Sequence, residues 1–178
     1  MNENLKLIIP TMEYEKEIQD YRQEFLTHGG DMDGCLSLRR MNNISEWIKQ
    51  VEDFSSPDSC PKEYVPQTQF ICVRESDNKV VGVIQIRHYF NEFLEKYGGH
   101  IGYSVCHSER KKGYATQMLK MILPTCRELG LGKILITCLQ ENEASRRVIE
   151  NNGGVFESTV YEPDEAVYLE RYWINLSD

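Results

Sequence analysis

The chain has 178 residues, of which 40% are hydrophobic and 27% are charged, an ordinary composition for a soluble globular protein. Its net charge of −8 argues against a nucleic acid as the main partner, because phosphate binding draws on concentrated lysine and arginine. No apolar run approaches the roughly 18 residues that span a bilayer, and residues 1–4 lack the pattern of a secretion signal, so we expect a cytoplasmic protein without a membrane partner.

The N-terminal segment is predicted to form a strand and then a helix. The strand covers residues 5–9 and ends at Pro10. Thr11 is placed to cap the helix that follows, and Ile18, Tyr21 and Phe25 give that helix one apolar stripe.

A second helix and a strand pair complete the first half of the chain. The helix is indicated by apolar residues at helical spacing, which are Ile44, Trp47, Ile48, Val51 and Phe54. Residues 55–66 contain three prolines and are expected to form a loop. Residues 68–75 and 79–90 are predicted strands, and the polar residues 76–78 between them favour a hairpin.

Residues 100–116 are the most informative segment of the chain. They predict a short strand that passes through a basic turn, residues 110–112, into a helix that begins near Gly113. The first N–H groups of a helix have no internal partners and the helix dipole is positive at that end, so such a turn binds anions. Gly113 allows the backbone to approach an anion closely, and the spacing suits a pyrophosphate.

The remaining elements alternate between helix and strand. A helix with a stripe from Ala115 to Cys126 is either kinked by Pro124 or begins its last turn there. The apolar run 133–139 predicts a strand covered on both faces, which suggests a parallel neighbour. Asn142 is placed to cap a fourth helix, and residues 155–161 and 166–176 predict a closing antiparallel pair. Periodicity therefore supports an α/β or α+β chain with one domain, residues 1–178.

The cysteines are expected to be buried and reduced, because no C-x-x-C pair is present. They are Cys35, Cys60, Cys72, Cys106, Cys126 and Cys138.

Two segments resemble the GCN5-related N-acetyltransferases, the GNAT family. Residues 110–115, Arg-Lys-Lys-Gly-Tyr-Ala, resemble the family signature that binds the pyrophosphate of acetyl-CoA. Residues 142–154 resemble the family's asparagine helix, which ends in a glycine before the next strand. Ile101–Val105 and Ser145 look most like the branch that includes ribosomal-protein N-acetyltransferases. The resemblance covers residues 68–161 well and implies the GNAT fold, a single mixed, largely antiparallel sheet of about seven strands with four helices on its faces.

The resemblance also implies the residues that bind acetyl-CoA. They lie on the strand before the turn, in the turn, and at the start of the asparagine helix: Tyr103, Ser104, Val105, Arg110, Lys111, Lys112, Gly113, Tyr114, Ala115, Thr116, Asn142 and Ser145. In the family the strand before the turn is splayed from its parallel neighbour, and its exposed backbone groups hold the pantetheine arm. The resemblance therefore implies that the backbone of residues 103–105 does so here, and that the N–H of Val105 donates to the oxyanion that forms when an amine attacks the thioester.

Proton transfer needs further groups. An amine of pKa about 10.4 is protonated at pH 7, and its deprotonation costs roughly 4.6 kcal/mol, so a general base is useful. The resemblance places His100 where several family members carry an acidic base, and the alternative is a hydrogen-bonded strand histidine. The usual acid, a tyrosine seven residues after the helix asparagine, is replaced by Ile149. Ser145 is then either the proton donor or a structural cap.

The acceptor is expected between two acidic loops. In this fold it enters between the loop of residues 29–34 and the loop between the last two strands. Their carboxylates are Asp31, Asp33, Glu162, Asp164 and Glu165. These would attract a cationic amine on a small molecule or a protein, unless the acidity only reflects the overall net charge.

We therefore expect an acetyl-CoA-dependent N-acetyltransferase that transfers the acetyl group to a primary, cationic amine by direct attack in a ternary complex, without a metal. The alternative is a non-catalytic domain that binds or senses acyl-CoA. A nucleotide-binding domain is disfavoured because neither G-x-x-x-x-G-K-[ST] nor G-x-G-x-x-G is present. The sequence leaves open whether the protein forms a homodimer.

Overall fold

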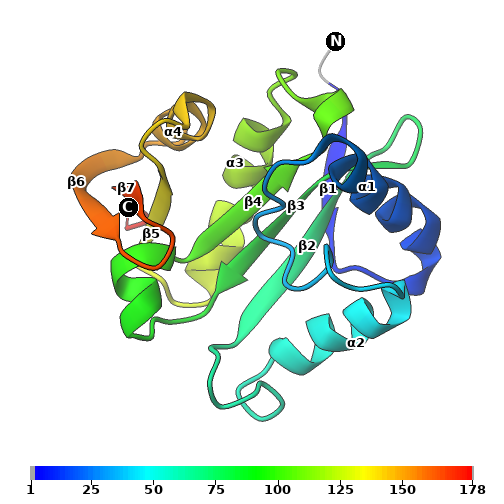
Figure 1. The fold of residues 1–178 in the computed structure, drawn as a ribbon, viewed down its shortest axis with the longest axis horizontal. Coiled ribbons are helices and arrows are strands. Elements are labelled where there is room, and N and C mark those ends of the chain that lie inside the picture. The colour runs from blue at the N-terminus through cyan, green and yellow to red at the C-terminus, as the bar shows by residue number, and fades with distance from the viewer. Residues whose placement is uncertain (1–2, 178) are drawn as a thin grey trace.

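The computed structural model describes residues 3–177. Its strands form two hydrogen-bonded groups, and its helices pack against them (Figure 1). In chain order the main elements are β1 Leu5–Ile8, α1 Glu15–His28, α2 Ile44–Phe54, β2 Gln67–Arg74, β3 Lys79–Arg87, β4 Ile101–Val105, α3 Tyr114–Glu128, β5 Lys133–Leu139, α4 Glu143–Glu150, β6 Val155–Glu162 and β7 Val167–Asn175. Short 3-10 turns cover Met12–Tyr14 and His107–Glu109, and a π-helical turn covers Leu94–Gly98.

Helices α1 and α2 cover one face of strands β1–β4 (Figure 1). The predicted stripe residues of both helices are buried, and they pack against β2 and β3 residues such as Ile71 and Val83. Helix α2 begins where predicted because the Asn43 side chain accepts the N–H of Ser45 at 2.8 Å. Helix α1 differs slightly, since Thr11 precedes a 3-10 turn and its side chain makes no capping bond.

Helix α3 covers the opposite face. Met118 and Leu119 are fully buried with Ile84 and Ile86 of β3, in a core that continues into β5 and β7. Pro124 lies inside the helix, which continues to Glu128. Gly130, with φ of +79°, then turns the chain out of the helix.

The seven expected strands are present, and every ladder between them is antiparallel. The order is β1-β2-β3-β4 in one group and β5-β7-β6 in the other. β4 is the neighbour of β5 on the side away from β7, but no ladder joins β4 to β5 (Figure 1). The expected single sheet is thus divided at this line, which we call the β4–β5 split.

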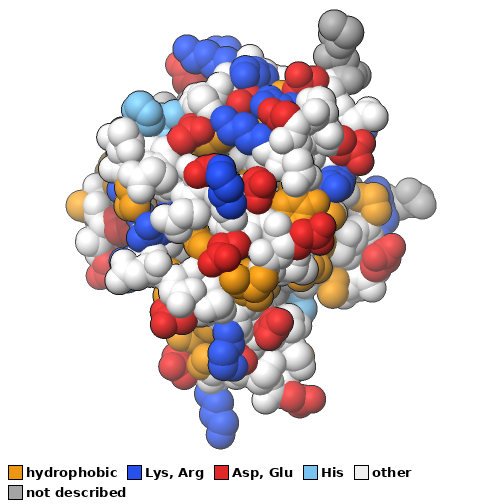
Figure 2. Space-filling model, turned by 90° about the vertical axis from the view of Figure 1, so that its right-hand side faces the viewer, with side chains coloured by type: hydrophobic (Ala, Val, Ile, Leu, Met, Phe, Trp, Pro, Cys, Tyr) orange, Lys and Arg blue, Asp and Glu red, His pale blue; other side chains and the backbone are white. Residues whose placement is uncertain are grey.

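All six cysteines are free, and all except the half-buried Cys60 are buried. The face that forms the right-hand side of Figure 1 carries lysine and arginine interspersed with aspartate and glutamate (Figure 2). None of the helices between residues 3 and 177 is both long and apolar enough to cross a bilayer.

Candidate active site

The basic turn presents a run of unpaired backbone donors. Gly113 adopts a left-handed φ of +81° at the start of α3, and Lys111 also has a positive φ of 63°. The first backbone bond of the helix is made by the N–H of Gln117, to the carbonyl of Gly113 at 3.1 Å. Within residues 3–177, the six N–H groups of residues 111–116 have no backbone or side-chain acceptor. Together with the positive end of a 15-residue helix, these donors form a site for an anion.

The three basic side chains of the turn are not equivalent. The guanidinium of Arg110 donates to the carbonyl of Val105 at 3.1 Å and lies over the ring of Phe25. Lys112 pairs with Glu109 at 2.8 Å. No such bond holds Lys111 within the described part of the chain, so Lys111 is the basic side chain most available to an incoming anion.

Glu109 lies at the base of the turn and is only 4% exposed. Its carboxylate is paired with Arg74 at 2.7 Å and with Lys79 at 3.1 Å, in addition to Lys112. Burial alone would raise the pKa of this carboxyl, but the hydrogen bonds from Lys112, Arg74 and Lys79 lower it to about 2. The sequence reasoning did not identify this residue.

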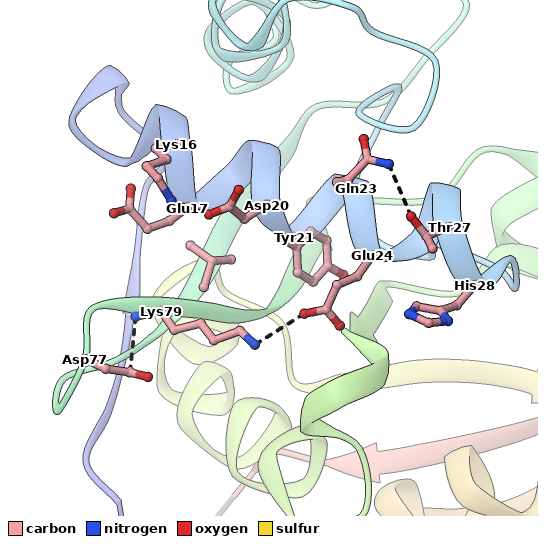
Figure 3. Close-up of a pocket in the computed structure, with 11 residues that line it drawn as sticks. Lys16, Glu17, Asp20, Tyr21, Gln23, Glu24, Thr27, His28, Asp77 and Lys79 are labelled. Carbon is pink, nitrogen blue, oxygen red and sulfur yellow. Dashed lines mark hydrogen bonds and ion pairs between the residues drawn. The ribbon is translucent and has the colours of Figure 1, made fainter.

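A hollow of about 430 Å³ lies beside this cluster, between α1 and the start of β3 (Figure 3). On its edge, Glu24 of α1 accepts from Lys79 at 3.2 Å, and also from the N–H and hydroxyl of Ser108 at 3.0 and 2.8 Å. Ser108 belongs to the 3-10 turn that leads into the anion site. This side of the molecule therefore holds the basic turn in place.

The β4–β5 split exposes backbone groups on both strands. The N–H of Cys106 bonds to Val81, and the carbonyl of His100 accepts the N–H of Arg87, so even-numbered residues of β4 bond to β3. Because alternate residues of a strand point to opposite sides, the N–H and C=O groups of Ile101, Tyr103 and Val105 face β5. No ladder partner meets them there in the described residues. This is where the sequence analysis placed the coenzyme arm and the oxyanion donor of Val105.

Helix α4 contributes one side chain to the split. The Asn142 side chain accepts the N–H of Ser145 at 3.1 Å, so Asn142 caps the helix as expected. The Ser145 hydroxyl lies 2.7 Å from the phenol oxygen of Tyr103 and is therefore free of a capping role. Burial raises the pKa of Tyr103, which stays protonated at neutral pH. Ile149, at the usual tyrosine position, is fully buried in the core and is unavailable to the site.

His100 lies in an environment that does not favour the expected role as base. The residue is 5% exposed, and its Nδ1 accepts the N–H of Leu135 at 2.9 Å. Burial, and then the charge of Arg87, lower its pKa to about 4. A proton acceptor of that basicity, with one nitrogen already bonded, is poorly suited to remove a proton from an ammonium group.

The first acidic loop lies directly on β4. A Cβ atom added to Gly34 would lie 2.1 Å from the carbonyl oxygen of Gly102, so only glycine fits this contact. The Ser104 hydroxyl donates to the carbonyl of Asp33 at 2.6 Å and lies 2.8 Å from the buried hydroxyl of Tyr21. Ser104 thus faces the acceptor loop, whereas the family resemblance implies a place for it among the residues that bind the coenzyme.

The charges of the two acidic loops influence each other. Although Asp33 is exposed as a residue, the pKa of its carboxyl is raised by desolvation and by the charges of Asp31 and Glu165, and Arg87 partly opposes this. Asp33 and Glu165 are both exposed, as are Asp31 and Asp164. Four of the five predicted acceptor carboxylates therefore stand at the surface of these loops.

Glu162 is the exception, and its predicted contact with the acceptor is not supported by its position. The residue is 4% exposed, and its carboxylate accepts the N–H groups of Asp164 and Glu165 at 3.2 and 2.7 Å. Both carboxylate oxygens of Glu162 thus accept hydrogen bonds that stabilise the turn between β6 and β7. Glu162 therefore orients the neighbouring carboxylates of the loop.

Comparison with known proteins agrees with this arrangement. The family described as Acetyltransferase (GNAT) domain matches residues 25–155. Curated protein sequences yielded no match. The chain therefore belongs to the GNAT acetyltransferases, and acetyl-CoA is its cosubstrate.

Solved structures share the fold at low sequence identity. The ribosomal-protein-S5-alanine acetyltransferase of Vibrio fischeri superimposes with a TM-score of 0.75 at 14% identity, over 100% of this chain and 96% of that one. RimJ of Mycobacterium smegmatis, solved with CoA-disulfide, gives 0.71 at 20% identity, over 96% and 81%. MccE, a microcin C7 self-immunity acetyltransferase solved with acetyl-CoA and AMP, gives 0.66 at 18% identity, over 98% and 93%.

Proposed function

We propose that this protein is an N-acetyltransferase that transfers the acetyl group of acetyl-CoA to a cationic primary amine by direct attack in a ternary complex. The observation that carries the proposal is that two sets of backbone hydrogen-bonding groups lie next to each other, one in the basic turn and one along β4. Six unpaired N–H groups at residues 111–116 suit the diphosphate, and the β4 groups that face the split suit the amides of the pantetheine arm.

The reacting thioester then lies near the end of β4. There the N–H of Val105 is the donor to the tetrahedral oxyanion, in line with its orientation toward the split. The Ser145 hydroxyl, supported by Tyr103, is the group that hydrogen-bonds to the departing thiolate. Since a thiol has a pKa of about 8.5, this bond assists departure without being essential.

The acceptor is proposed to enter between the two acidic loops. Asp31, Asp33, Asp164 and Glu165 are exposed there and supply negative potential for an ammonium group. We assign proton removal to Asp33 in place of His100. A carboxylate whose pKa is raised by desolvation and by the charges of Asp31 and Glu165 is a better base than an ordinary one. The name of the ribosomal-protein-S5-alanine acetyltransferase suggests a protein amine as one acceptor to test, and that of a spermidine N-acetyltransferase among the structural neighbours suggests a polyamine as another.

The experiment is a screen of amines with acetyl-CoA, with free thiol as the readout. Protein N-terminal peptides, lysine peptides, polyamines and aminoglycosides form the panel, and an uncharged amine of similar size is the control. Turnover with a cationic amine supports the proposal. Tight acetyl-CoA binding without thiol release from any amine would instead support the non-catalytic acyl-CoA-binding domain.

A further inference from the structure

His100 bonds to both polar backbone groups of one residue on the neighbouring strand. The backbone N–H of His100 donates to the carbonyl of Leu135 at 2.8 Å, and the imidazole Nδ1 accepts the N–H of Leu135 at 2.9 Å. The imidazole therefore occupies the place that a backbone carbonyl would take in a parallel ladder. Because Nδ1 accepts, the ring proton must reside on Nε2.

The ladder cannot continue past His100. In a regular parallel pair, the carbonyl of His100 would next accept the N–H of Thr137. That carbonyl instead accepts the N–H of Arg87 on β3, at 2.8 Å. β4 is thus bound to β5 at His100 and to β3 immediately afterwards, so the split begins at this residue.

Several contacts fix the imidazole in this position. The ring lies on that of Phe90, with centroids 4.0 Å apart. Gly99, with φ of +64°, brings the chain so close to β5 that an added Cβ would lie 2.6 Å from the carbonyl oxygen of Leu135. Leu135 itself is fully buried, so without the imidazole its N–H would have no access to water.

We infer that His100 is a positioning residue that fixes where β4 separates from β5 and thereby keeps the split open for the pantetheine arm of the coenzyme. This inference rests on the proposed function of the split. If the Nδ1 acceptor is removed, the buried N–H of Leu135 loses its hydrogen bond, and β4 and β5 must shift relative to each other to supply another acceptor. The strands then close over part of the site.

Substitutions of His100 that place an acceptor atom at different distances from the backbone distinguish a positioning role from a role in proton transfer. Asparagine places its Oδ1 at the same bond distance from the backbone as Nδ1, so His100→Asn keeps the acceptor. Glutamine places its acceptor at the position of Nε2, so His100→Gln loses the bond to Leu135 while matching His100→Asn in chemistry. His100→Ala has no acceptor. Neither amide can act as a base.

The probes are coenzyme A and adenosine 3′,5′-diphosphate, which keeps the adenosine, its 3′ phosphate and the first 5′ phosphate of coenzyme A but lacks the second phosphate and the pantetheine arm. Affinities are measured by calorimetry, and thermal unfolding shows that each variant is folded. We expect His100→Gln and His100→Ala to weaken coenzyme A binding roughly tenfold, a change that corresponds to the loss of one good hydrogen bond. His100→Asn should stay within about twofold of the original protein, since it keeps that bond. Binding of adenosine 3′,5′-diphosphate should not change in any variant.

Equal losses in His100→Asn and His100→Gln, or equal losses for both probes, would overturn the inference. Unchanged coenzyme A binding in all three variants would overturn it as well. Failure of the original protein to bind coenzyme A would refute the proposed function itself, and it is therefore distinguishable from a failure of the inference. If His100→Ala does not fold, the Asn and Gln pair still gives the comparison.

Discussion

The phenol oxygen of Tyr103 lies 2.7 Å from the hydroxyl oxygen of Ser145, although 42 positions separate the two residues in the chain. The bond crosses from β4 to the first turn of α4, at the place where the thioester is proposed to react. It supplies a hydroxyl pair in a site whose usual tyrosine position holds the buried Ile149.

We predict that Ser145→Ala lowers turnover roughly tenfold at pH 7, and that the defect fades as the pH approaches about 8.5, where a thiolate leaves without protonation. Tyr103→Phe should cause a similar defect, and the double variant should be no worse than either, because one bond is shared. The measurement is the pH dependence of kcat from thiol release. A defect that is constant across pH would assign Ser145 to coenzyme positioning.

Gly113→Val should weaken coenzyme A binding at least roughly tenfold, because valine is strained at a φ of +81° and its side chain would enter the open space above the donors. Gly130→Val is the matched control. Gly130 has a φ of +79°, also has open space around it, and lies at the opposite end of α3. Both variants should lose similar stability in urea titrations, and only Gly113→Val should lose affinity in calorimetry. Intact binding by folded Gly113→Val would remove the turn from the site.

Neutralising Asp31, Asp33, Asp164 and Glu165 to the amides should raise KM for a cationic amine and leave KM for acetyl-CoA nearly unchanged. The effect should shrink at high salt, because exposed charges are screened over about 8 Å at physiological ionic strength. Single variants separate the roles: Asp33→Asn should lower kcat, while Asp164→Asn should act mainly on KM. Steady-state kinetics at two salt concentrations provide the test, and equal effects on both substrates would indicate damage to the fold.

The burial of His100 predicts a loss of stability in mild acid. Its pKa is lowered from 6.5 to about 4, so between these values the unfolded chain binds a proton that the native protein does not. Stability is therefore full above pH 6.5 and falls as the pH drops. From pH 7.5 to 5.0 the loss should be about 2 kcal/mol, and His100→Asn should lack this part.

Urea unfolding at the two pH values measures the difference. His88 and His107, whose pKa values burial also lowers, titrate in both proteins and cancel in the comparison. An identical pH dependence in the variant would mean that His100 is not buried in the neutral form.

The regular elements could be predicted from the sequence because local patterns determine them. The α2 stripe and its Asn43 cap, and the glycine turn into α3, depend on residues a few positions apart. The resemblance implied that β4 is splayed from its neighbour, but the residue at which the sheet divides could not be predicted. That residue is set by the carbonyl of His100, which accepts the N–H of Arg87 and not that of Thr137, and both partners are distant from it in the chain.

The role of a single polar side chain was similarly hard to predict. Glu162 and Asp164 look alike in an acidic loop, yet only the turn geometry decides that Glu162 folds back on its own backbone. His100 occupies the position of a base by resemblance, and its bond to Leu135 comes from a strand 35 residues away. Composition and spacing contain no signal for either outcome.

The carboxylate of Glu109 has one further consequence for coenzyme binding. Arg74, Lys79 and Lys112 all pair with it, so their mutual repulsion is offset by a charge of the protein itself. This carboxylate holds the turn in one conformation, so the proposed diphosphate site needs no rearrangement of its amides to bind. An internal anion of this kind therefore makes the turn rigid and at the same time lowers the positive potential that the turn presents to a ligand.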